Sequence, residues 1–155
     1  MSAQRVRAWS RQMREVHERL RAALSLSRQA LEDGGHLDSL TRETLLYCWG
    51  FCTALRGHHR SEDQVLFPRL SGAHPDLVPV ISQLIQDHNM IAHLIGELER
   101  SLDSGTTTVD KLRHLDGIEA VMETHFRYEE RRLLAVLDDV ADESLTATDL
   151  FGPLA

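Results

Sequence analysis

The chain has 155 residues, of which 42% are apolar, and it carries a formal charge of -7 at pH 7. This length predicts a single domain with a sizeable core, and no stretch is apolar enough to suggest a secretory signal or a membrane span. Because the sequence has a net negative charge and no cluster of basic residues, a surface that binds nucleic-acid phosphates is not expected. We therefore expect a cytoplasmic protein that binds neither a membrane nor a nucleic acid.

Apolar residues with helical periodicity first run over residues 5–31, and Gly34-Gly35 supplies a helix C-terminal signal. A second helical segment begins near Ser39, a suitable N-cap, and is expected to be disturbed at Pro68. These two patterns predict a pair of helices.

The two cysteines, Cys48 and Cys52, lie in the second segment and are four residues apart. This spacing does not match the C-x-x-C pattern of redox and zinc motifs. We interpret both residues as core packing, since free cysteine behaves as a small buried apolar residue.

A third segment opens at Pro75, which suits the first turn of a helix, and its apolar stripe continues to Leu98. A fourth follows Thr108 and keeps its stripe to Leu137. Short connections favour antiparallel neighbours, so the economical fold is an all-α, up-down-up-down four-helix bundle.

We place this bundle at residues 5–140 and an acidic C-terminal tail at residues 141–155. The tail has only a weak apolar pattern. We expect residues beyond Glu143 to contribute little to a functional site.

One arrangement of ligand-type residues occurs twice, which indicates an internal duplication. In each copy a histidine is followed about forty residues later by His-x-x-x-Glu. The copies are His17 with His58-x-x-x-Glu62, and His88 with His125-x-x-x-Glu129.

Residues four apart lie on one face of an α-helix, so a His and a Glu with this spacing can converge on one ion or on two adjacent ions. At a rise of about 1.5 Å per residue, the four histidines fall at similar heights on the four predicted helices. Glu62 and Glu129 lie on apolar helix faces, where a carboxylate needs a cationic partner. The pattern predicts a dinuclear metal site of four imidazoles and two carboxylates. Iron is the first choice for its redox chemistry, while zinc or manganese also suits these ligands.

These residues resemble the hemerythrin-like family, in its H...HxxxE...H...HxxxE variant. The resemblance covers roughly residues 5 to 140. It rests on His58-x-x-x-Glu62-Asp63-x-x-Leu66-Phe67-Pro68, on Asp87-His88, and on His125-Phe126-x-Tyr128-Glu129-Glu130.

The resemblance implies two iron ions with an oxo or hydroxo bridge from solvent. It also implies that Glu62 and Glu129 bridge the ions and that the four histidines are terminal ligands. Oxygen-carrying members of the family have a fifth histidine four residues after the third, whereas this chain has Ala92 there. The expected site therefore has four His and two Glu.

The function expected from this site is to bind or redox-process oxygen, peroxide or nitric oxide. The alternative is a non-catalytic iron-binding module for iron sensing, storage or iron-centre repair. Whether His59 or His93 also contacts metal stays open, as do the electron donor and any protein partner.

Overall fold

The computed structural model describes residues 2–34, 42–140 and 144–155, with the backbone alone over residues 2–8. Within these ranges the chain is helical and has no β-strand, which confirms the all-α class. In chain order the elements are α1 (Ser2–Gly34), α2 (Arg42–Ser61), the π-helical turn η1 (Glu62–Leu66), α3 (Phe67–Ala73), the 3-10 turn η2 (Pro75–Leu77), α4 (Val78–Asp103), α5 (Thr108–Leu137) and α6 (Ala147–Phe151). No helix in the described ranges is long and apolar enough to cross a membrane.

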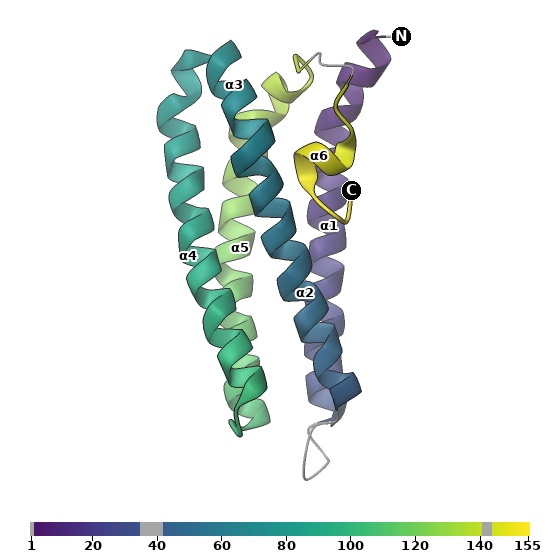
Figure 1. The fold of residues 1–155 in the computed structure, drawn as a ribbon, viewed down its shortest axis with the longest axis vertical. Helices are drawn as coiled ribbons and strands as arrows, with labels where there is room; N and C mark the ends of the chain where they lie inside the picture. The colour runs from purple at the N-terminus through teal and green to yellow at the C-terminus, as the bar shows by residue number, and fades with distance from the viewer. Residues whose placement is uncertain (1, 35–41, 141–143) are drawn as a thin grey trace.

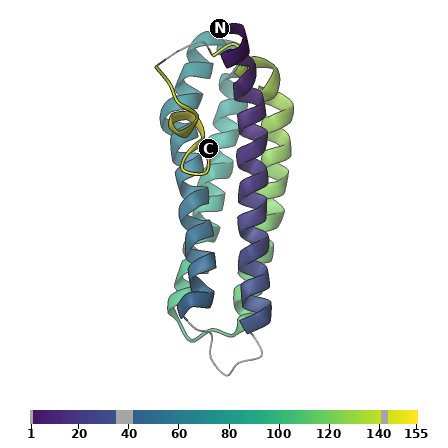
Figure 2. The ribbon, with the colours of Figure 1, turned by 90° about the vertical axis from the view of Figure 1, so that its right-hand side faces the viewer.

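The long helices run side by side along the long axis of the molecule (Figure 1). Helix α1 packs against α2 and α5, and α4 packs against α5 and α2. The short helix α6 lies against α2 and α1, nearer the end of the molecule that holds the N-terminus (Figure 2).

The apolar stripes predicted for the four segments form the core. In α1, Met13, Leu20 and Leu31 are fully buried, and α4 buries Leu84 and other stripe residues in the same way. Each such side chain contributes roughly 1.5–3 kcal/mol relative to an exposed position. Cys48 and Cys52 are free and fully buried, as their interpretation as core residues requires.

The second segment is disturbed just before Pro68, as expected, but the chain stays helical beyond it. The chain passes from α2 through the π-helical turn η1 into α3, and the Phe67 backbone N–H donates to the Glu62 carbonyl, five residues back. A proline inside an α-helix clashes with the carbonyl four residues earlier. The wider turn just before Pro68 relieves that clash, and this explains why the helix does not end there.

The third and fourth segments begin close to the expected positions. Pro75 starts the 3-10 turn η2, so α4 itself begins a turn later at Val78. Helix α5 is capped by the Thr107 side chain, which accepts from the backbone N–H of Asp110. The expected N-cap Ser39 and the glycine Gly35 lie outside the described residues.

The C-terminal residues are not a featureless tail. Residues 147–151 form α6, which begins with a reciprocal capping box between Thr146 and Asp149. Leu150 and Phe151 are fully buried against the long helices.

Candidate metal centre

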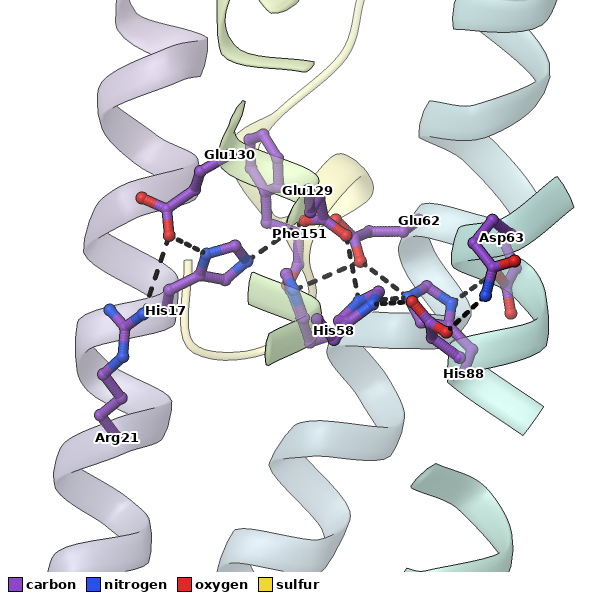
Figure 3. A network of polar contacts seen from close by, with 12 residues as sticks. His17, Arg21, His58, Glu62, Asp63, His88, Glu129, Glu130 and Phe151 are labelled. Carbon is purple, nitrogen blue, oxygen red and sulfur yellow. Dashed lines mark hydrogen bonds and ion pairs between the residues drawn. The ribbon is translucent and has the colours of Figure 1, made fainter. Parts of the chain in front are cut away.

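The structure brings the six predicted site residues together in the interior. None has more than 2% of its surface exposed. Their side chains come from five elements, and Figure 3 shows those of His17, His58, Glu62, His88 and Glu129 at one level of the molecule. The six are His17 on α1, His58 on α2, Glu62 on η1, His88 on α4, and His125 and Glu129 on α5.

The ligand-type atoms of these six residues and of the neighbouring His59 fall into two groups. One group holds His17, His58, Glu62 and Glu129, and the other holds His59, Glu62, His88 and His125. Within each group the four atoms lie within 4.8 Å of one another. Glu62 belongs to both groups, as a carboxylate between two adjacent ions would.

Glu62 and Glu129 each reach imidazoles on both sides of the cluster. The Glu62 Oε1 atom lies 3.3 Å from Nε2 of both His58 and His88. The Glu129 oxygens lie 3.2 Å from Nε2 of His17 and of His125. Both His-x-x-x-Glu pairs therefore converge within one turn, as the spacing of four predicts.

Outer acceptors orient the four imidazoles. His17 Nδ1 lies 3.2 Å from a Glu130 carboxylate oxygen, His88 Nδ1 lies 2.7 Å from Asp63, and His125 Nδ1 lies 3.1 Å from Asp87. His58 Nδ1 lies 2.7 Å from the backbone carbonyl oxygen of Phe151. Since these oxygens accept, each Nδ1 donates, and this leaves the lone pair on the inward-facing Nε2. Such outer partners are typical of metal-binding histidines.

The repeated His...His-x-x-x-Glu arrangement relates three of these partners to one another and leaves His58 without a matching acid. The acid after each site glutamate holds a histidine of the other half: Asp63 holds His88 (Figure 3), and Glu130 holds His17. Asp87, which precedes His88, holds His125. The residue before His17 is Val16, which cannot do so.

Helix α6 supplies the acceptor that Val16 cannot. The Phe151 carbonyl oxygen lies at the end of α6 and accepts from His58. The expectation that residues beyond Glu143 contribute little to the site is therefore wrong. A short apolar helix with a backbone acceptor leaves no ligand-type signal in the sequence, so the sequence could not reveal this contact.

Unsatisfied polar atoms concentrate in this cluster. Among the described residues, the buried side-chain atoms without a hydrogen-bond partner are Nε2 of His17, His58 and His59 and both carboxylate oxygens of Glu62 and Glu129. Each such atom costs about 1–3 kcal/mol unless a partner compensates. Two cations that accept imidazole and carboxylate donors would compensate all of them, so these residues fit a metal site.

Without metal, the two buried glutamates titrate in opposite directions. Burial and the charge of Glu129 raise the pKa of Glu62 well above its ordinary value. Burial acts in the same direction on Glu129, but the contacts with His125 and His17 outweigh it and hold the pKa of Glu129 well below its ordinary value. Without metal, Glu62 therefore holds its proton more readily than Glu129 does.

The histidines divide in a similar way. Burial lowers the pKa of His58 to about 3, and it lowers the pKa of His59 well below 6.5. Burial also acts on His17 and His125, yet their glutamate and aspartate neighbours outweigh it and raise both pKa values.

Of the two open histidines, one joins the cluster. The ring of His59 is 5% exposed and lies among the site imidazoles. His93 instead faces solvent, 65% exposed, and pairs with Glu97 on its own helix. The position of His59 around its helix does not decide whether it reaches the site, because it lies only 100° from the site residue His58.

The helical scaffold, the converging donors and their outer acceptors define a metal-binding protein. The chain belongs to the hemerythrin family, since the model of the hemerythrin HHE cation binding domain matches residues 10–137. Searches of curated proteins and of solved structures found no match.

Proposed function

We propose that this chain is a non-heme di-iron protein, built as an up-down-up-down four-helix bundle, that binds or redox-processes a small ligand such as oxygen, peroxide or nitric oxide. The observation that carries the proposal is the set of buried, unpartnered donor atoms of His17, His58, Glu62 and Glu129. The packing of α1 on α2 and α5, and of α4 on α5, supports the bundle.

The ligand assignment follows the two groups of donor atoms. His17 and His58 would hold one ion, and His88 and His125 would hold the other. Glu62 and Glu129 would bridge, because each contacts imidazoles of both pairs. Imidazole and carboxylate donors without thiolate suit iron, and they also accept zinc or manganese.

Bound iron would supply reversible electron transfer and a coordination position for the small ligand. Two imidazoles and two carboxylate oxygens would hold each ion, which would leave room in its coordination sphere for solvent and a small ligand. The protein orients the imidazoles through their Nδ1 partners. Leu55, Ile91 and Met122 are buried in the apolar core, which favours a small ligand over a large one.

The first experiment is to purify the protein aerobically, measure metal per chain, and record the visible spectrum. The spectrum is then followed through reduction and re-exposure to oxygen, peroxide and nitric oxide. Two irons with charge-transfer bands that bleach on reduction and return with one oxidant support the proposal. Two irons with a spectrum indifferent to all three would favour the alternative of an iron-binding module for sensing, storage or repair.

Variants test the bridging glutamates. Glu62→Ala and Glu129→Ala should each abolish loading with two metals, because each removes a donor from both positions. Glu97→Ala is the matched control, since Glu97 pairs with the exposed His93 on its own helix and lies outside both donor groups of the described residues. A Glu62 or Glu129 variant that still holds two irons and the wild-type spectrum would refute the assignment.

A further inference from the structure

His59 and Phe126 occupy equivalent positions in the two halves of the site. Each directly follows the histidine of a His-x-x-x-Glu pair. The ring of Phe126 stacks on His17 with centroids 3.8 Å apart and planes 6° apart. The ring of His59 stacks on His88 with centroids 3.8 Å apart and planes 12° apart. The two rings therefore perform the same packing role.

Phe126 shows that this packing role needs no polar atom, yet His59 brings one into the interior. Its Nε2 atom is buried and has no hydrogen-bond partner. Leaving a polar atom unsatisfied costs about 1–3 kcal/mol, a cost that the phenylalanine in the other half avoids. The nitrogen of His59 therefore requires a partner that is not part of the chain.

The stacking geometry indicates what kind of partner this is. An imidazole coordinates a metal in its own ring plane, so an ion held by His88 lies close to the plane of the His88 ring. The His59 ring is nearly parallel to that plane and displaced from it. An ion in the plane of the His88 ring would therefore lie outside the plane of the His59 ring, although the ligand-type atom of His59 lies within 4.8 Å of those of Glu62, His88 and His125. This geometry suits a hydrogen bond to a group on the ion better than a direct bond to the ion.

An open cavity reaches this side of the site. It has a volume of about 280 Å³ and is lined by His59, His88 and Ala92, with Arg56 and Arg60 also on its wall. Ala92 is small, so its side chain leaves room beside His88. The cavity could admit a small molecule. Arg56 is paired with Glu99 and Asp63 also lines the wall, so the Arg60 guanidinium is the group that favours an anion.

We propose that His59 Nε2 hydrogen-bonds to a small anion or diatomic ligand bound at the metal position of His88 and His125. The two metal positions are then unequal: a polar ring borders one, and the apolar ring of Phe126 borders the other. This inference rests on the proposed di-metal site.

The test uses the full-length ferric protein with azide as the probe. Azide affinity is measured by titrating its charge-transfer band, and metal per chain is measured on the same samples. His59→Phe keeps a stacked ring, as Phe126 does, but removes the nitrogen. His59→Gln keeps a hydrogen-bonding group but removes the ring. Together they separate the hydrogen bond from the stack.

We expect both variants to hold two irons. His59→Phe should weaken azide binding about tenfold, the scale of one hydrogen bond to a charged ligand, while His59→Gln should retain most of the affinity. Unchanged azide binding in His59→Phe, or equal weakening in both variants, would overturn the inference. Loss of iron from His59→Phe alone would identify His59 as a direct ligand and also overturn it. A wild-type protein without two irons would instead refute the proposed function itself.

Discussion

Substituting Gly152 by alanine should weaken metal binding, although this residue is not itself a proposed ligand. Gly152 has φ 92° and ψ -166°, a conformation accessible almost only to glycine. A Cβ at this position would lie 2.8 Å from backbone atoms of Gly57 and His58. Backbone atoms cannot rotate away, so the end of α6 must move from α2.

The movement acts on the site through Phe151. Its carbonyl oxygen, one residue before Gly152, accepts from His58 Nδ1 at 2.7 Å. The backbone conformation alone costs of order 1–3 kcal/mol with a side chain present, comparable to the hydrogen bond that would be given up. Loss of such an outer partner typically lowers metal affinity about 10–100-fold.

The assay is competition for iron against a chelator of known affinity, combined with urea unfolding of the metal-free protein. Gly50→Ala is the matched control, because Gly50 lies inside α2 with nothing within 4 Å of the added Cβ. That control should keep wild-type affinity and gain about 0.5–1 kcal/mol of stability. Wild-type affinity in Gly152→Ala would refute the role assigned to α6.

Three further predictions concern the outer partners, the pH response and the thiols. Asp63→Asn and Glu130→Gln should each lower metal affinity about 10–100-fold in the same chelator competition, and equal affinity to wild type would contradict the orienting role. The metal-free protein should be most stable near pH 6.5, as measured by urea unfolding. As the pH falls below 6.5, the unfolded state gains a proton on His58 that the folded state, with a pKa of about 3, does not take up, so the folded state loses stability. As the pH rises above 6.5, His17 and His125 lose protons that their raised pKa values had held in the folded state, so stability falls again. A steady rise of stability from pH 6 to 8 would contradict this balance. Burial raises the pKa of Cys48 to about 11 and that of Cys52 to about 12, so neither thiol should react with a thiol reagent at pH 8 until the protein unfolds.

The sequence predicted the convergence of the site residues because their signal is local. A spacing of four puts His58 with Glu62 and His125 with Glu129 on one helix face each, and those pairs do meet. The heights of His17 and His88 were predicted by counting residues along helices expected to be antiparallel. The apolar stripes likewise predicted the buried faces of the long helices.

Other features depend on contacts that no local pattern records. The π-helical turn before Pro68 results from a steric conflict that could equally have ended the helix. The contact between Phe151 and His58 joins residues 93 positions apart through a backbone atom. The sequence does place an acidic residue beside three of the predicted site residues, namely Asp63, Asp87 and Glu130. The histidines that these acids contact lie on other helices, so the sequence does not show which acid pairs with which histidine.

The crossed contacts of Asp63 with His88 and of Glu130 with His17 have a consequence for how such a site can arise. Each half of the chain holds a histidine of the other half, which is the reciprocity of an interface between two identical subunits. A single helical hairpin with one copy of the motif would leave its own first histidine without an acceptor. It would need a second hairpin before it could offer an oriented metal site. Covalent linkage of the two halves makes that pairing independent of protein concentration. It also allows the two halves to differ, as they do at His59 and Phe126.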